Sequence, residues 1–242
     1  WAREAAMNPA ELTGQADTHV VAFEDTGLRV HRDVAAALAA LRAAAAAAGH
    51  DLAVASAFRD FARQRELWNA KWRGERPVLD AEGRPLDVAA LPSPARIAAI
   101  LGWSALPGGS RHHWGTDVDV WDRAAVGPDY RLQLSAAEYG PGGPFAALTA
   151  WLDRHMRRFG FYRPYATGVG GVRPEPWHLS FAPLAEPARR ALGADALAAA
   201  LRGGRVLGEE TILGMLPEIH ARYVATVDRP PRMRSRWARA AR

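Results

Sequence analysis

The chain has 242 residues, which is enough for one large domain or for a smaller domain with extensions. Hydrophobic residues make up 49% and charged residues 24% of it, a globular composition that excludes a largely disordered or collagen-like chain. There is no cysteine, so disulfide bonds, a thiol nucleophile and cysteine-ligated metals are excluded. No run of about 18 or more strongly apolar residues is present, and we expect no transmembrane span.

Positive charge is concentrated at the C-terminal end. The net charge is +5, but the last 14 residues hold six arginines and no acidic residue. Without those six, 25 basic side chains face 26 acidic ones, so the rest of the chain has a net charge of −1. This nearly neutral body argues against a specific nucleic-acid-binding protein. We expect a solvated arginine-rich tail, with contact to an anionic surface as the alternative. Its arginines are Arg229, Arg232, Arg234, Arg236, Arg239 and Arg242.

The first half of the chain alternates between short strands and helices. A strand is predicted at 19–23, and an alanine-rich helix follows, with Asp33 as its N-cap and Gly49 at its C-terminal end. Alternating side chains predict a second strand at 51–58. An amphipathic helix is expected at 60–72. Glycine, proline and aspartate at 73–92 indicate a long loop.

The second half begins with a helix whose start is marked by Ser93-Pro94. The elements predicted after it are a strand at 116–121, an amphipathic helix at 144–159, a strand at 177–181 and helices beyond Pro183. Helices and strands do not follow a regular βαβ order. We therefore predict an α+β fold with a small, largely antiparallel sheet flanked by helices.

Three short motifs carry the chemistry. They read SAFR at 56–59, SRHHWGTDVD at 110–119 and EPWH at 175–178. The second and third motifs supply two imidazoles and a carboxylate, a ligand set that suits zinc with one position left for water. A turn at Gly115 brings His112 and Asp119 together, and His178 is available as the third ligand. Glu175 is then free to act as a general base on a water if the chain bends at Pro176.

Spacing alone leaves several assignments open. His113 competes with His112, and Asp117 and Asp122 compete with Asp119, because alternation along a strand puts Asp117 and Asp119 on the same face. Trp114 and Trp177 either pack in the core or line a cleft. The remaining histidines have no supporting pattern, so we expect surface or core roles for His19, His31, His50, His155 and His220.

The three motifs resemble those of the VanY-like zinc D-alanyl-D-alanine carboxypeptidases. The shared pattern is S-x-Y/F-R, then S-x-H-x-x-G-x-x-x-D, then E-x-W-H, and this chain has all three in order, with Phe58 where tyrosine is commoner. The resemblance covers about residues 28 to 181. It implies the fold of the LAS-type metallopeptidases, one zinc ion per chain and a peptide of peptidoglycan as the substrate.

The resemblance also implies a role for each motif residue. It makes His112, Asp119 and His178 the zinc ligands and Glu175 the catalytic base. Arg59 faces the substrate carbonyl or the terminal carboxylate, for which its planar fork of donors is suited. The substrate-binding positions that it implies are Ser110, Gln64 and Trp177, and an exposed helix position is the alternative for Gln64.

The expected reaction is the removal of the C-terminal D-alanine from a peptidoglycan stem peptide. An L,D-carboxypeptidase, an endopeptidase and a non-catalytic stem-peptide-binding module are the alternatives. We expect a catalytic domain at 1–185, whose residues 1–27 form an N-terminal extension, and a helical C-terminal extension at 186–242. A wall substrate and a chain that starts at Trp1 favour export to the periplasm, with a cytoplasmic role in wall recycling as the alternative.

Overall fold

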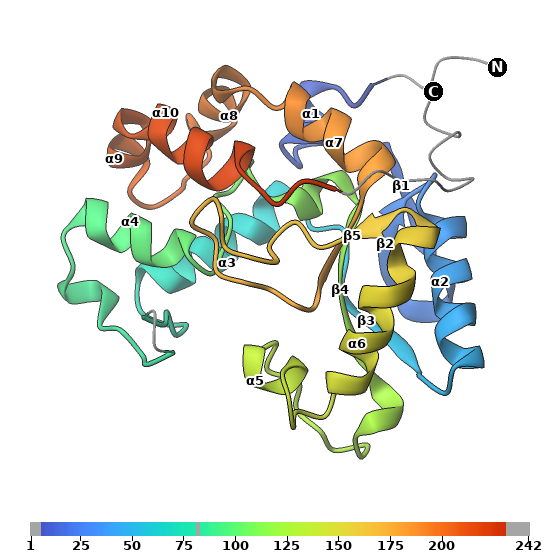
Figure 1. Cartoon of the computed structure of the whole chain (residues 1–242). Coiled ribbons are helices and arrows are strands. Elements are labelled where there is room, and N and C mark those ends of the chain that lie inside the picture. Colours follow the sequence, from blue (N-terminus) through green and yellow to red (C-terminus); the bar gives the residue numbers. More distant parts are fainter. Residues whose placement is uncertain (1–5, 81–82, 231–242) are drawn as a thin grey trace.

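A computed structural model describes residues 6–80 and 83–230 and has the predicted α+β architecture (Figure 1). Its centre is a four-stranded sheet in the order β3-β4-β6-β5. All three strand pairs of this sheet are antiparallel. A separate antiparallel pair, β1-β2, lies nearby. The strands are β1 (Val20–Phe23), β2 (Leu28–His31), β3 (Leu52–Ser56), β4 (Asp117–Asp122), β5 (Phe161–Tyr162) and β6 (His178–Phe181).

Two helices cover one side of the sheet. They are α2 (Ala35–Ala47) and α6 (Ala146–His155), and Figure 1 shows both on the same side. Leu38 and Leu41 of α2 and Leu148 of α6 are buried with Val118 and Val120 of β4 in one hydrophobic cluster. The sheet and these two helices form the rigid base from which the polar residues of β4 and β6 project.

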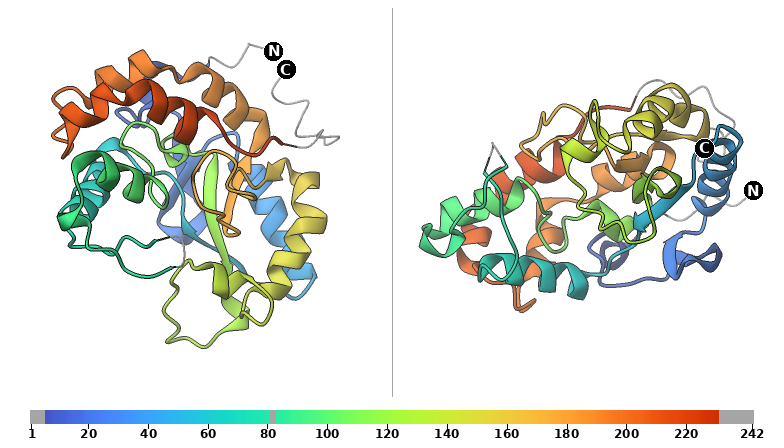
Figure 2. Two further views of the ribbon diagram at one scale, coloured as in Figure 1. Left: turned by 60° about the vertical axis from the view of Figure 1, so that its left-hand side comes forward. Right: turned by 90° about the horizontal axis from the view of Figure 1, so that it is seen from below.

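A second hydrophobic cluster joins helices from the middle and the end of the chain. Trp68 and Ile97 are buried together with Leu197, Leu201 and Ile212. Figure 2 shows the orange and red helices α7–α10 beside the cyan and green helices α3 and α4. The C-terminal helices therefore pack against α3 and hold it in place. These helices are α3 (Phe61–Trp72), α4 (Ser93–Leu101), α7 (Ala182–Ala191), α8 (Ala194–Leu201), α9 (Glu209–Gly214) and α10 (Leu216–Ile219).

Most predicted elements are present, with local corrections. Asp60 is the N-cap of α3, and its carboxylate accepts a hydrogen bond from the backbone N–H of Arg63. Asp33 is not the N-cap of α2, because that position belongs to Val34 and has no side-chain cap. In α4, Ser93 is the first helical residue instead of the cap, which is Pro92. The predictions also missed β2 and β5; β5 is two residues long, too short for alternation to reveal.

The segments outside the motifs pack against them. Leu12 ends the short helix α1 (Pro9–Leu12), and its carbonyl accepts a hydrogen bond of 3.1 Å from the indole N–H of Trp114. The short helix α5 (Ala136–Tyr139) lies at the other end of the sheet. A single π-helical turn, His220–Ala225, follows α10. In the described part of the chain, no helix is both long enough and apolar enough to cross a membrane. Of the arginine-rich tail, only Arg229 lies within the described residues.

Candidate metal centre

The register of the central sheet places Asp119 beside His178. Asp119 of β4 is the direct cross-strand partner of His178 on β6. On the other side of β4, the partner of Asp119 is Ser56 of β3, next to an irregularity in the pairing. Directly opposed side chains on adjacent strands lie close enough to interact. Two motifs that are far apart in the sequence therefore meet on one face of the sheet.

His112 reaches this face from the turn before β4. It lies in the single 3-10 turn Arg111–Trp114, which ends at Gly115 with a left-handed φ of 64°. A Cβ at Gly115 would lie 2.6 Å from the backbone nitrogen of His31, so the position needs glycine. The Nδ1–H of His112 donates to the carbonyl of Ala57 over 2.8 Å. This bond directs Nε2 toward Asp119, at 3.3 Å from Oδ2.

The donor atoms of His112, Asp119 and His178 lie within 4.8 Å of one another. Each imidazole has a nitrogen 3.3 Å from an oxygen of Asp119, close to the about 3.4 Å that separates tetrahedral ligands with bonds of about 2.1 Å. Oδ1 of Asp119 is buried without a hydrogen-bond partner. This is the only such cluster found in the described residues, and its nitrogen and oxygen donors fit a divalent cation such as zinc.

His178 is held from behind by a second carboxylate. Its Nε2–H donates to Oδ1 of Asp117 over 3.0 Å, which leaves Nδ1 for the metal position. Asp117 also accepts a hydrogen bond of 2.8 Å from Nε of Arg111, and both side chains are buried. A carboxylate behind a metal-ligating imidazole fixes the tautomer and the orientation of the ring.

Charge near the metal position is predominantly negative. Burial raises the pKa of Asp119, but the adjacent His112 and His178 outweigh this effect and hold the pKa well below its usual range. Burial lowers the pKa of His178, but its contacts with Asp117, Asp119 and Glu175 raise it well above the usual value overall. Several carboxylates that converge on one imidazole form a site that a cation would neutralise.

Glu175 stands next to the three candidate ligands. A turn closed by the hydrogen bond from the His178 N–H to the Glu175 carbonyl, 3.2 Å, brings the two side chains together. Oε2 of Glu175 lies 3.1 Å from Nδ1 of His178, the nitrogen that faces the metal position. The predicted bend around Pro176 is therefore present. Glu175 is placed where a base can reach a water at the metal position.

The arginine of the first motif is anchored by neutral partners. Nη1 of Arg59 donates to Oε1 of Gln64 over 2.7 Å, and Nη2 donates to Oγ of Ser56 over 2.9 Å. Gln64 also donates to the carbonyl of Ala105 and is fully buried, so the alternative of an exposed helix residue is wrong. The substrate-binding role of Gln64 stays a prediction, whereas its contact with Arg59 is a feature of the structure.

The competitors that spacing left open have other partners. His113 is buried, with Nδ1 donating to the carbonyl of Arg59 and Nε2 accepting from the N–H of Gly108. Burial lowers the pKa of His113 to about 3, so this imidazole is neutral. Asp122 accepts a hydrogen bond of 2.6 Å from Nδ1 of His50. Trp114 lies in the core cluster that includes Trp68. None of these side chains contributes to the cluster of three ligands.

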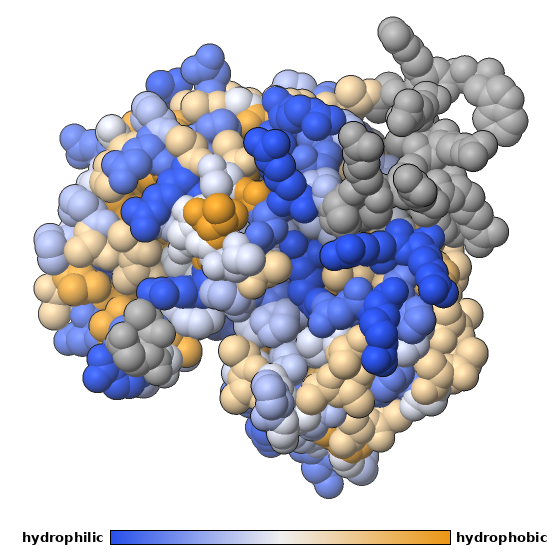
Figure 3. Space-filling view, in the orientation of Figure 1, coloured by the Kyte–Doolittle hydropathy of each residue, from blue (hydrophilic) through white to orange (hydrophobic). Residues whose placement is uncertain are grey.

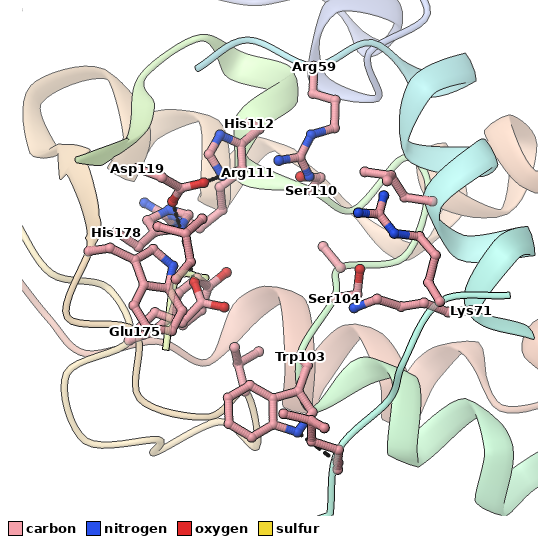
Figure 4. Close-up of a pocket in the computed structure, with 18 of the residues that line it drawn as sticks. Arg59, Lys71, Trp103, Ser104, Ser110, Arg111, His112, Asp119, Glu175 and His178 are labelled. Carbon is pink, nitrogen blue, oxygen red and sulfur yellow. Dashed lines mark hydrogen bonds and ion pairs between the residues drawn. The ribbon is translucent and has the colours of Figure 1, made fainter. Parts of the chain in front are cut away.

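A cavity of about 520 Å³ opens in front of the candidate ligands (Figure 4). Ser110 and Trp177 line it, as predicted, together with Arg59 and Glu175. Trp177 also packs against Tyr139, with ring centroids 5.5 Å apart. Figure 3 shows the surface hollowed between the parts of the molecule that contain α4 and α5. This volume is in the range of pockets that bind drug-sized ligands, so the cavity is large enough for a short peptide.

Comparison with known proteins identifies the family. The VanY family, described as D-alanyl-D-alanine carboxypeptidase, matches residues 27–184. The chain belongs to this family. Two uncharacterized proteins of Haemophilus influenzae (strain ATCC 51907 / DSM 11121 / KW20 / Rd) are also similar to it. One is 36% identical over 117 residues, or 48% of this chain and 89% of the relative. The other is 41% identical over 103 residues, or 41% of this chain and 70% of the relative.

Solved structures of VanY-like peptidases are similar to the chain. One is the D,D-pentapeptidase VanY from a VanB-type vancomycin resistance cassette, solved as a glutamate-to-alanine mutant in complex with Zn(II). It is 28% identical, with a TM-score of 0.50, and the match covers 69% of this chain and 80% of that chain. VanYB in complex with D-alanine-D-alanine is 24% identical (TM-score 0.52; 82% and 90% covered). The LD-carboxypeptidase LdcB is 18% identical (TM-score 0.52; 74% of each chain). VanYB and LdcB are each less than 25% identical to the chain, so these two comparisons show only a shared fold. A shared fold does not separate D,D from L,D specificity.

Sequence reasoning missed four residues around the family's site. Arg111 holds Asp117, and the ring of Tyr165 packs edge-on against His178 with centroids 5.1 Å apart. Lys71 and Arg76 line the cavity on the side of α3. Helical spacing is a signal for Lys71, because it follows Gln64 by seven residues and shares its face of α3.

Proposed function

We propose that this protein is a zinc-dependent carboxypeptidase that removes the C-terminal D-alanine from peptidoglycan stem peptides. Membership of the VanY family supports the reaction class. The observation that carries the proposal is the convergence of His112, Asp119 and His178 beside a glutamate, Glu175, that is free to act as a base. The Zn(II) complex of a 28% identical VanY supports the choice of metal.

Each residue of the cavity has a defined task in this reaction. Zinc, when held by His112, Asp119 and His178, supplies Lewis-acid activation of water and of the scissile carbonyl. Glu175 accepts a proton from the attacking water and passes it to the amine nitrogen of the leaving D-alanine. Arg59 donates hydrogen bonds to the developing oxyanion or to the terminal carboxylate, and Gln64 and Ser56 hold its guanidinium in place.

Digestion of purified muropeptides tests the proposed specificity. Mass spectrometry should show that the zinc-loaded protein removes one alanine from a pentapeptide stem and leaves a tetrapeptide stem intact. Loss of one alanine from the tetrapeptide instead would establish an L,D-carboxypeptidase, and cleavage of cross-linked dimers would establish an endopeptidase. A protein that binds pentapeptide stems without cleaving them would be a binding module.

Two substitutions test the assigned roles. Glu175→Ala should retain zinc and lose about a hundred- to ten-thousandfold in kcat, the range expected for a general base. His178→Ala should lose zinc as well as activity. His155→Ala is the matched control, because that imidazole packs against Trp151 and does not line the cavity. If metal analysis shows Glu175→Ala without zinc and His178→Ala fully loaded, the role assignment is wrong.

Inhibitors provide a separate check of the reaction class. A chelator should abolish turnover, and added zinc should restore it. The reaction forms no acyl-enzyme, so a β-lactam should leave turnover unchanged. Export to the periplasm, a domain boundary near residue 185 and a role of the arginine-rich tail at an anionic surface remain proposals; most of that tail lies outside the described residues.

A further inference from the structure

The cavity has more positive charge than hydrolysis of a terminal D-alanine needs. Asp119 and Glu175 offset the charge of a divalent ion, and Asp117 neutralises Arg111 at 2.8 Å. Three further cations line the cavity, namely Arg59, Lys71 and Arg76. Under the proposed function, a substrate brings one terminal carboxylate to this group. Two positive charges then stay unmatched.

Lys71 and Arg76 have no anionic partner within residues 6–80 and 83–230. Lys71 is in the last turn of α3, and Figure 4 shows its side chain turned into the cavity beside Ser104. Arg76 follows the left-handed turn at Gly74 and lies at the exposed edge of the same wall. Neither side chain makes an ion pair or donates a hydrogen bond to a described residue.

The nearby acids are occupied on the outer side of α3. Glu75 binds Arg73 through two hydrogen bonds, of 2.6 and 2.8 Å, and Glu66 pairs with Arg63 at 3.0 Å. Arg63 and Arg73 are therefore neutralised by these acids, whereas Lys71 and Arg76 are not.

The protonation of Lys71 reflects this lack of a partner. Burial and the nearby Arg76 together lower the pKa of Lys71 to about 8, although Glu175 across the cavity raises it. A cation that is partly buried beside another cation is stabilised when an anion binds between them. This wall of the cavity is therefore suited to a carboxylate.

We propose that Lys71 and Arg76 form a second anion subsite, which binds a side-chain carboxylate on the third residue from the C-terminus of the substrate peptide. The inference rests on the proposed function. Under that function the last two residues are D-alanines, which have no side-chain carboxylate. The first residue that can supply a second carboxylate is therefore the third from the C-terminus, which precedes the scissile bond. The preferred substrates are then acidic peptides, and neutral peptides of the same length are poorer ligands.

Isosteric peptides test this subsite by binding instead of turnover. The ligands are acetyl-L-glutamyl-D-alanyl-D-alanine and its glutaminyl counterpart, with a second pair that has one more methylene in the side chain. Calorimetry uses the zinc-loaded Glu175→Gln variant, which does not consume them. In at least one pair the acid should bind about tenfold to a hundredfold more tightly than the amide, as expected for charge-assisted hydrogen bonds.

Substitutions in the same background decide the assignment. With Lys71→Met and Arg76→Gln added, the preference for the acid should fall to about one, while Arg63→Gln on the outer face should preserve it. Equal affinities for acid and amide in both pairs would overturn the subsite, and so would a preference that survives the double substitution. Failure of the unaltered enzyme to release D-alanine from these peptides would refute the proposed function instead, whatever the ratio of affinities.

Discussion

The buried carboxylate behind His178 provides a direct test of the candidate metal centre. Asp117→Asn removes the charge that holds Nε2 of His178 over 3.0 Å and Nε of Arg111 over 2.8 Å. Loss of a carboxylate behind a ligating imidazole typically reduces metal affinity about tenfold to a hundredfold, or about 1.4 to 2.7 kcal/mol. We therefore expect the zinc dissociation constant of Asp117→Asn to rise by this factor.

The same substitution has a second consequence for the metal-free protein. Arg111 is only 2% exposed and would lose its carboxylate partner, although it would keep the hydroxyl of Ser180 at 2.7 Å. Removal of one partner of a buried ion pair costs about 3 to 5 kcal/mol. Urea unfolding of the metal-free protein should show a loss of this order.

Asp122→Asn is the matched control on the same strand. Asp122 is also buried and also accepts a hydrogen bond from an imidazole, at 2.6 Å from His50, but this imidazole is not a candidate ligand. Zinc affinity is measured by competition with a chromophoric chelator, and near-ultraviolet circular dichroism confirms that both variants are folded. If Asp117→Asn binds zinc within threefold of the unaltered protein, or if Asp122→Asn loses as much affinity, the inferred role of Asp117 is refuted.

Three further outcomes are expected. Gly115→Ala should lower the free energy of unfolding by more than about 1 to 2 kcal/mol, because a left-handed φ is combined with a contact of 2.6 Å. The control is Gly127→Ala, where a Cβ would point into open space; in a thermal melt it should cost less than half as much. Burial lowers the pKa of His31 to about 4, so unfolding takes up a proton below pH 6.5. His31 should account for about 2 kcal/mol of the stability lost between pH 7 and pH 5, so His31→Gln should lose about that much less than the unaltered protein. Gln64→Met should lower kcat/KM about tenfold or more, with zinc content unchanged, because Arg59 loses one of its two anchors and keeps only Ser56.

The regular elements were predictable where local signals agree with packing. The helix predicted at 60–72 is present as Phe61–Trp72, because Asp60 caps it locally and an amphipathic run follows. The cap at Asp33 was wrong because the chain between β2 and α2 takes another path, in which His31 receives the N–H of Asp33 at Nδ1 and Val34 starts the helix. Strand β5 exists only because β6 lies beside it, which local sequence does not encode.

The candidate site was more predictable than its surroundings. The motifs name chemically special residues, and their convergence follows from an antiparallel sheet that brings β4 next to β6. The cavity-facing cations were not predictable in the same way. Lys71 and Arg76 face the cavity, whereas Arg73 between them is exposed and paired with Glu75. Composition does not distinguish the two cavity-facing cations from the exposed one.

Which aspartate of β4 is available as a metal ligand depends on the charges around it, and the alternating strand pattern does not reveal those charges. Alternation separates Asp122 from the other two, yet it leaves Asp117 and Asp119 on one face, where both contact His178. Asp117 is already neutralised by Arg111 and accepts a further hydrogen bond of 2.6 Å from Thr116, so both of its oxygens already have donors. Oδ1 of Asp119 has no such donor. A buried arginine next to His112 in the sequence thus decides which carboxylate remains available to a metal.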